Sequence, residues 1–322
     1  MLKKLQVLTN AIFHHTDAQL TDTKKWHYLF GSVLLLCCGI KLYYGIQNTM
    51  DVQYADEAAY LRFGLDLFEK MNRNWGPLYA IWYKCLSFIS ADTIQLYYLN
   101  FVSTSVLIGV LLYIFLLRLS VNSVFALLIS FSVLVSDLNI SVWPRISHFC
   151  IMLCLLALIL ISFLKNNIYK CLVFTLLCLL NAYARPEFYL SFLLMVFVTL
   201  ICIYYNKATL AKEDIYIFSG TIILIAILHF IFRFPSNDFF GFNRGVAAFY
   251  QHYAVNYKIR TEGTFDAWLY WEEIARNQFG DCNSMWCVVK TQPMIFISNT
   301  LFNIKNYFLQ LLRIFTYGFP IG

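Results

Sequence analysis

The feature that most constrains this chain is a series of apolar runs, each about 20 residues long and almost free of charge. One such run suffices for an α-helix to cross the hydrocarbon core of a bilayer. Composition agrees, because 60% of the residues are hydrophobic and 13% are charged, whereas a soluble domain carries about 25% charged residues. The sequence therefore predicts an all-α polytopic membrane protein in a lipid bilayer. The seven expected spans, with edges good to about 2–4 residues, are 29–48, 97–118, 121–138, 146–165, 168–184, 187–206 and 214–233.

The basic residues indicate how the chain is oriented in the membrane. With a cytoplasmic N-terminus, nine lysines and arginines fall in the inner tail and inner loops, and two arginines fall in the short outer turns. This asymmetry obeys the positive-inside rule and predicts a multi-pass protein of the plasma (inner) membrane. The net charge of +6 is not gathered on a soluble face, so nucleic acid is not expected as a partner.

The orientation divides the chain into four parts. A cytoplasmic tail (1–28) precedes a seven-span module (29–233) that contains a first outer segment (49–96). A second outer segment (234–293) and an amphipathic or membrane helix (294–322) follow. Most acidic residues lie in the two outer segments, so any chemistry is expected at the outer membrane face. Whether the chain is complete after its last residue stays open.

Two short helices are expected within the first outer segment. The first covers 56–68, where apolar side chains recur at helical spacing at Tyr60, Phe63, Leu67 and Phe68. The second runs over about 77–89 and begins with a proline, which suits a first helical turn. Both are predicted to lie along the membrane surface with their aromatic side towards lipid.

An acidic pair, Asp56 and Glu57, opens the first of these helices. One interpretation is structural, because the helix macrodipole stabilises negative charge at an N-terminus. The other is functional: a carboxylate held at the water–lipid boundary can take a proton from an acceptor hydroxyl. The residues alone leave both interpretations open.

The order of motifs resembles that of a known enzyme superfamily. One span, then Asp56-Glu57-x-x-Tyr60 in an outer segment, then Gly76-Pro77-Leu78-Tyr79, resembles the GT-C glycosyltransferases. The similarity is closest to the branch of protein mannosyltransferases and aminoarabinose transferases (glycosyltransferase family 39-like). Further similarity to bacterial members follows at Phe242-Asn243-Arg244, at Ala248 to Ala254 and at Gln292 to Phe296, so that it covers most of 29–300.

The resemblance implies a seven-span GT-C-like module, with interfacial helices after the first span, that moves a sugar from a polyprenyl-phosphate donor with inversion. Asp56 would be the general base, and Glu57 and Tyr60 would position it or the acceptor. The acceptor is left open among a glycan, a lipid and a protein. No nucleotide is needed, because the lipid phosphate is the leaving group. A divalent metal is left open, and the spacing of ligand-type residues gives it no support.

Two arginines beside prolines at the outer turns are candidate phosphate ligands. Arg145 follows Pro144, and Arg185 precedes Pro186 with Glu187 in reach to orient it. A guanidinium binds phosphate oxygens through a planar fork, but it also snorkels to lipid head groups. The candidates for donor phosphate or sugar in the second outer segment are Arg244, Gln251 and His252, each with a structural role as the alternative.

Other functions stay open beside the enzyme. The chain departs from aminoarabinose transferases in its second surface helix, where Trp75-Gly76-Pro77 replaces a Lys-Pro-Pro whose lysine holds the lipid phosphate. A transporter or flippase for lipid-linked glycans is the first alternative, although the spans lack the paired charges usual in transporters. A non-catalytic GT-C-like subunit of a cell-envelope assembly machine is the second.

Two of the ten cysteines, Cys282 and Cys287, lie in the second outer segment. An oxidising outer compartment permits a small loop-closing disulfide between them. A disulfide and two free thiols are equally compatible with the sequence.

Overall fold

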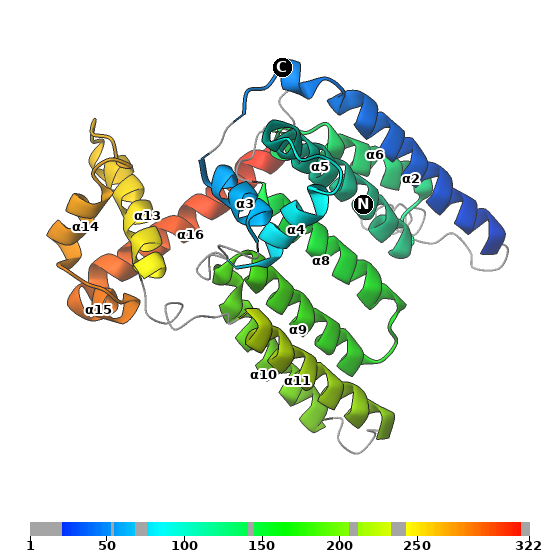
Figure 1. Ribbon diagram of the computed structural model, residues 1–322. Helices are drawn as coiled ribbons and strands as arrows, with labels where there is room; N and C mark the ends of the chain where they lie inside the picture. The colour runs from blue at the N-terminus through cyan, green and yellow to red at the C-terminus, as the bar shows by residue number, and fades with distance from the viewer. Residues whose placement is uncertain are drawn as a thin grey trace, which may run out of the picture. The chain divides into compact units, whose positions relative to one another are not determined.

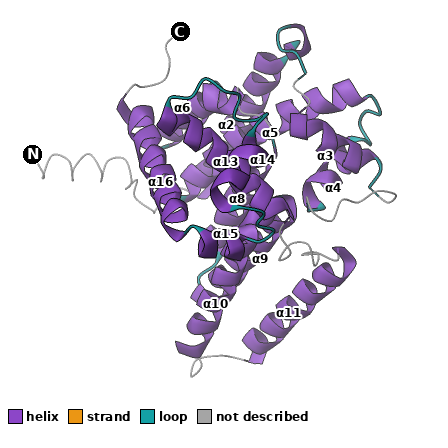
Figure 2. Cartoon of the chain, turned by 90° about the vertical axis from the view of Figure 1, so that its left-hand side faces the viewer, coloured by secondary structure: helices purple, strands orange, loops and turns teal. Residues whose placement is uncertain are grey.

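The computed structural model describes residues 21–52, 55–67, 76–140, 145–205, 212–232 and 243–316. These residues form helices joined by turns, without a strand (Figure 2). The chain divides into two compact units, Met1–Phe232 and Arg233–Gly322, which are described separately below (Figure 1).

Five helical stretches in the described part of the first unit are long and apolar enough to cross a membrane. They lie in or around α2 (Thr21–Tyr43), α5 (Thr93–Arg118), α8 (Ile146–Phe163), α9 (Asn167–Ala184) and α10 (Tyr189–Tyr205). The coarse prediction of an all-helical chain with several candidate spans is therefore confirmed. Asparagine and aspartate side chains cap three helices of this unit, at Asp92, Asn122 and Asn166.

The spans expected at 121–138 and 214–233 form shorter apolar helices. The first is α6 (Ser123–Leu134), which is followed by the single turn α7 (Asp137–Ile140). The 12 residues of α6 extend about 18 Å, less than the roughly 30 Å of a hydrocarbon core. In the second stretch, the apolar part is Tyr216–Ile231, within α11 (Lys212–Phe232).

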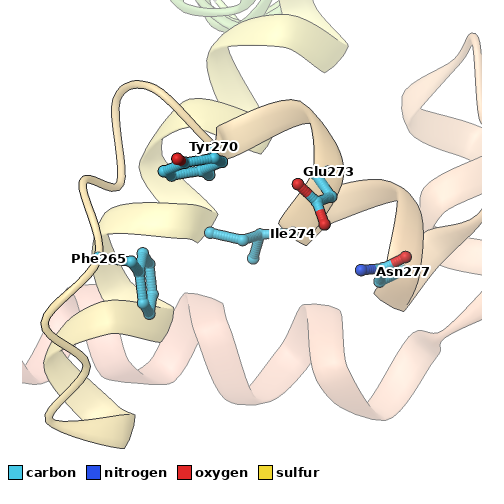
Figure 3. A pocket seen from close by; sticks show the side chains of 5 residues that line it. All are labelled: Phe265, Tyr270, Glu273, Ile274 and Asn277. Atoms are coloured by element: carbon cyan, nitrogen blue, oxygen red, sulfur yellow. The ribbon is translucent and has the colours of Figure 1, made fainter.

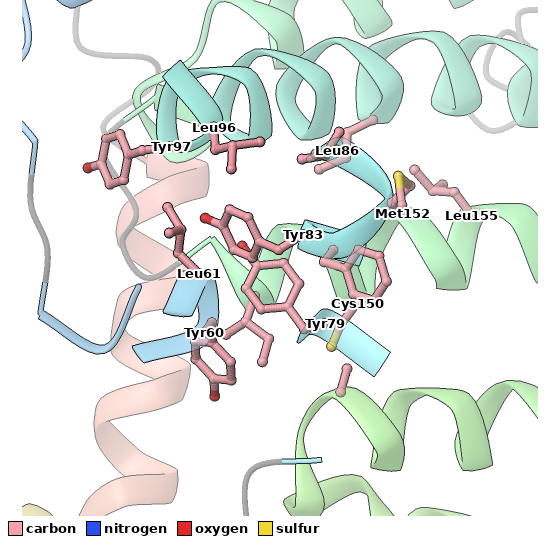
Figure 4. Packing of buried hydrophobic residues seen from close by; sticks show 14 residues of the cluster. Tyr60, Leu61, Tyr79, Tyr83, Leu86, Leu96, Tyr97, Cys150, Met152 and Leu155 are labelled. Carbon is pink, nitrogen blue, oxygen red and sulfur yellow. The ribbon is translucent and has the colours of Figure 1, made fainter. Parts of the chain in front are cut away.

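The two short helices expected after the first span are present as α3 (Ala55–Leu65) and α4 (Leu78–Leu86). Their aromatic faces, however, do not face lipid, and that part of the prediction is wrong. Tyr60, Tyr79 and Tyr83 are at most 3% exposed, in a cluster with residues of α5 and α8 (Figure 4). The cause is close packing, because a Cβ on Gly64 of α3 would lie 2.4 Å from the Tyr83 Cβ of α4.

The long helices of this unit are fastened at both ends. At one end the Tyr43 hydroxyl of α2 donates to the Leu134 carbonyl of α6 (2.6 Å). At the other end Arg118 of α5 donates from Nε and Nη2 to the hydroxyl and carbonyl of Ser162, each at 2.9 Å. The Arg118 guanidinium also lies 3.8 Å from the centre of the Phe163 ring. These contacts join the helices near their ends.

The second unit consists of α13 (Asn243–Thr261), α14 (Trp271–Phe279), α15 (Met285–Thr291) and α16 (Pro293–Thr316). Its core is aromatic, with Tyr250, Tyr253 and Phe279 buried among α13, α14 and α15. Cys282 and Cys287 form a disulfide with their Cα atoms 5.5 Å apart, which decides between the two alternatives left by the sequence.

Candidate functional site

Glu57, in the first turn of α3, is a carboxylate enclosed by protein, with 1% of the residue exposed. Its Oε1 accepts hydrogen bonds from the hydroxyls of Tyr79 and Tyr83 and from Asn100 Nδ2 (3.0 Å). Its Oε2 accepts from the main-chain N–H of Arg145 (2.8 Å). One carboxylate therefore ties α3 to α4, to α5 and to the turn before α8.

The partners of Glu57 are themselves held in place. Asn100 Nδ2 also donates to the hydroxyl oxygens of Tyr79 (2.7 Å) and Tyr83 (2.9 Å). Trp82 Nε1 donates to Asn100 Oδ1 (2.8 Å), which fixes the orientation of the amide. A fully connected network of this kind stabilises a single arrangement of the helices, because any missing partner leaves a buried polar group unsatisfied.

Burial and hydrogen bonding act on the Glu57 carboxyl in opposite directions. Burial, the larger effect, raises the pKa of Glu57 above its usual value. The hydrogen bonds from Tyr79, Tyr83 and the Arg145 main chain favour the carboxylate and partly offset that rise. Burial, followed by the effect of neighbouring groups, raises the pKa of both tyrosines well above the usual value, so both remain donors at neutral pH.

Arg145, in the turn before α8, is buried, with 0% of the residue exposed. Its Nη1 donates to the Asn139 carbonyl (2.7 Å), and its Nη2 donates to the hydroxyls of Thr104 (3.3 Å) and Ser105. The guanidinium also lies 4.5 Å from the centre of the Phe101 ring. Burial lowers the pKa of Arg145 to about 10, so the group is still charged at neutral pH. Buried in this way, the guanidinium is not open to solvent, lipid head groups or a ligand phosphate.

Arg185 follows the last residue of α9 and keeps 40% of its side chain exposed. Its Nη1 donates to the hydroxyl of Ser147 (3.0 Å), and its Nε lies 3.7 Å from Glu187 Oε2. Extended backbone at Arg185, followed by Pro186 at the start of a short 3₁₀ turn, aims the side chain away from the axis of α9. The Arg185 side chain is therefore held in position by Ser147 and Glu187, while part of its guanidinium stays exposed and can donate to a ligand.

The start of α8 connects the Glu57 carboxylate with the Arg185 guanidinium. Arg145, which donates to Glu57, and Ser147, which accepts from Arg185, are two residues apart. The start of α4 meets the same region: Gly76 has φ of +71°, and a Cβ there would lie 2.3 Å from the Tyr183 carbonyl oxygen at the end of α9. The acidic end of α3 and the Arg185 guanidinium thus lie at the same end of the first unit.

The remaining predicted residues of the first unit divide between surface and core. Asp56 is exposed, although the neighbouring Glu57 is buried. Tyr60 is buried and packs edge-on against the Tyr79 ring, with centroids 5.1 Å apart. Within this unit, then, Asp56, Arg185 and Glu187 are the candidates that a ligand can reach.

The three candidates of the second unit all lie on α13. The Arg244 side chain lies outside the described residues. Gln251 is half-buried and His252 is exposed. The His252 ring packs edge-on against Trp268, with centroids 6.4 Å apart.

Sequence reasoning missed the polar residues of α5 that complete the network. Asn100, Thr104 and Ser105 are buried, and they interrupt an otherwise apolar run at positions i, i+4 and i+5. Polar side chains grouped on one face of a candidate span are costly in lipid and usually meet partners inside the protein. The grouping of these three residues on α5 was the sequence signal that could have indicated a buried polar network.

Neither a metal site within the described ranges nor a related protein was found that bears on this site. Among the described residues, no three histidine, cysteine or acidic side chains are grouped so as to hold a metal ion. Comparison with protein-family models, curated proteins and solved structures finds no match.

Proposed function

We propose that this protein is an integral-membrane glycosyltransferase that moves a sugar from a polyprenyl-phosphate donor to an acceptor at the outer face of the plasma membrane. The observation that carries the proposal is that two residues at the start of α8 hold both groups: Arg145, just before the helix, binds Glu57, and Ser147, in its first turn, binds Arg185. An exposed carboxylate, Asp56, and a half-exposed guanidinium are thereby held at one end of a helical bundle. General acid–base chemistry beside a phosphate leaving group requires such a pair.

In the proposed reaction the acceptor oxygen attacks the anomeric carbon, and the bond from that carbon to the phosphate oxygen breaks. Asp56 takes the acceptor proton, and the polyprenyl phosphate leaves with the bonding electrons. Arg185 stabilises the charge that develops on the departing phosphate. Attack from the face opposite to the leaving group inverts the anomeric centre.

Glu57 and Arg145 act on this reaction as positioning residues. Successive residues of an α-helix point about 100° apart, so anchoring Glu57 inwards presents Asp56 to the outside. Arg145 holds the turn before α8 through buried contacts with α5, and this turn carries the N–H that Glu57 accepts. In the full proposal, α6 with α7 and α11 complete a seven-span GT-C-like module around the five long helices.

The Asp56→Asn variant tests the proposal, because it keeps the shape of the side chain and removes its basicity. Turnover of a panel of undecaprenyl-phosphate-linked hexoses by the purified protein should fall by roughly 10²–10⁴-fold. Binding of the same donors should change much less. Asp66→Asn is the matched control, because Asp66 lies just after the same helix and pairs loosely with Arg62 (3.9 Å). Equal turnover by both variants and the wild type would reject Asp56 as the base, whereas no turnover of any donor by the wild type would favour a non-catalytic subunit.

A further inference from the structure

A separate cavity, distant in sequence from Asp56, lies within the second unit. It has a volume of about 500 Å³, which is within the range of small-molecule sites. Its lining residues are Phe265, Tyr270, Glu273, Ile274 and Asn277. Figure 3 shows the two aromatic rings at one side, Ile274 extending between them, and Glu273 and Asn277 along α14.

Four of these residues form one face of α14 and its N-cap. Tyr270, Glu273, Ile274 and Asn277 are spaced i, i+3, i+4 and i+7, so a single helical face presents an aromatic ring, a carboxylate, an alkyl group and an amide. The opposite face carries Ala275 and Phe279, which are buried in the core of the unit. The helix is therefore anchored by one face and offers the other to a ligand.

The aromatic wall is held in place by the segment that joins α13 to α14. Phe265 packs against Tyr257 of α13, with ring centroids 6.3 Å apart. Its ring also lies over Gly263, where a Cβ would come within 2.3 Å of Phe265 Cε1. The Asp266 side chain accepts from the main-chain N–H groups of Trp268 (2.8 Å) and Leu269 (3.2 Å). The cavity is thus formed before any ligand arrives.

The charges around the cavity favour a ligand that is not an anion. Glu272 and Asp281 both pair with Arg276, at 2.7 and 3.3 Å. Glu273 and Asn277 are exposed and take no part in the side-chain hydrogen bonds or ion pairs found within the described residues. The free carboxylate repels a phosphate, so the cavity does not suit the donor's lipid phosphate.

We infer that this cavity binds a pyranose ring of a neutral or amino sugar. The C–H face of a pyranose stacks on an aromatic ring, as other apolar surfaces do. Its hydroxyls donate to the Glu273 carboxylate, and the Asn277 amide both donates and accepts. The assignment of this ring to the acceptor rests on the proposed function. The acceptor is then a glycan or a glycosylated molecule.

Binding is tested without turnover, so failure here is distinguishable from failure of Asp56 as the base. The full-length protein in detergent is applied to an array of immobilised hexoses, hexosamines, deoxyhexoses, uronic acids and their oligomers. The wild type should bind at least one neutral or amino sugar. Glu273→Gln and Tyr270→Ala should each weaken that binding by roughly tenfold or more, as expected for loss of a charged hydrogen bond or of the stacking ring.

Glu272→Gln is the matched control, because Glu272 is adjacent on the same helix and does not line the cavity. Its affinity should stay within about twofold of wild type, since its exposed ion pair contributes little. Gly263→Ala is a second probe: its methyl group displaces the Phe265 ring, and it should weaken binding without removing any ligand-binding group. A thermal unfolding midpoint in detergent close to that of the wild type shows that each variant has folded.

Three results would overturn the inference. The first is a wild type that binds no sugar on the array. The second is equal loss of binding in Glu272→Gln and Glu273→Gln, or loss in neither. The third is saturable binding of tetramethylammonium without sugar binding, which would make the cavity a site for organic cations.

Discussion

Two acidic pairs with described side chains, each in the first turn of a helix, have different roles. Asp56 and Glu57 open α3, and Glu272 and Glu273 open α14. In α3 the second acid is buried in a network of four segments, and the first is exposed. In α14 the first acid pairs with Arg276, and the second lines an open cavity.

The difference shows what a local motif determines. The helix macrodipole favours negative charge in any first turn, which accounts for both pairs. It does not determine which acid is buried, because that depends on the elements packed against the helix. α3 lies against α4, α5 and the turn before α8, whereas α14 buries Ala275 and Phe279 and leaves Glu272 and Glu273 exposed.

The largest expected difference between the pairs is in stability. Glu57→Ala leaves the hydroxyls of Tyr79 and Tyr83 and the main-chain N–H of Arg145 buried without their acceptor, which should destabilise the protein by about 3–5 kcal/mol. Glu272→Ala removes one exposed ion pair and should cost at most about 1 kcal/mol. Denaturant titration of the purified protein in detergent measures both. Comparable losses for the two variants would show that the Glu57 network contributes no special stability.

Arg185 tests whether the first region recognises phosphate. Arg185→Lys keeps the charge and loses the planar fork, so affinity for undecaprenyl phosphate should weaken by about 1.5–3 kcal/mol. Arg62→Lys is the control, because Arg62 is an exposed arginine of α3 with 71% of its side chain accessible. Calorimetry in one detergent compares the three proteins. If wild type and Arg185→Lys bind equally, Arg185 is a membrane anchor.

A pair of glycines tests how tightly the first region is packed. In Gly76→Ala the new Cβ meets the Tyr183 carbonyl at 2.3 Å, at a positive φ, so stability should fall by roughly 1–3 kcal/mol. A Cβ added to Gly220 of α11 would meet no atom within 4 Å, and Gly220→Ala should stabilise the helix by about 0.5–1 kcal/mol. Thermal unfolding midpoints in detergent should move in opposite directions. A stabilising Gly76→Ala would contradict the close approach of α4 to α9.

The smallest expected effect is a pH dependence that belongs to Glu57. Because burial raises its pKa in the folded protein, the folded state binds more protons than the unfolded state at pH values between the two pKa values. Its contribution to stability is complete below the unfolded pKa and is lost as pH rises through the folded pKa, with a slope of at most about 1.4 kcal/mol per pH unit. Glu57→Gln should flatten this slope at pH values above the unfolded pKa of Glu57 in unfolding titrations, after subtraction of the slope that both proteins share. Identical slopes would place the titrating group elsewhere.

Much of the helical arrangement could be predicted because hydropathy is a local property. The positions of the five long helices follow from runs of apolar residues, and α3 and α4 follow from helical spacing. The environment of Tyr60 could not be predicted, since an aromatic stripe suits lipid and protein equally. The length of α6 was also predicted wrongly, because the expected span ran to 138 and the helix ends at Leu134, two residues before Ser136 and Asp137.

The candidate site was predicted in its residue types and not in their roles. Asp56, Glu57, Arg145 and Arg185 were all singled out by charge and position. That Arg145 is buried and Arg185 is half exposed depends on α5, whose Thr104 and Ser105 meet the first guanidinium across about 40 positions of sequence. No local pattern encodes a contact at that separation.

The sequence by itself determined that this chain is helical, apolar and acidic at the start of α3, because length, hydropathy and first-turn charge act within one segment. Tertiary structure alone decided that Glu57 is enclosed and Asp56 exposed, that Cys282 pairs with Cys287, and that Glu273 lines a cavity. The physical reason is that burial is a property of the neighbours. A carboxylate of the same type becomes an anchor where three other segments supply donors, and a ligand-binding group where none does.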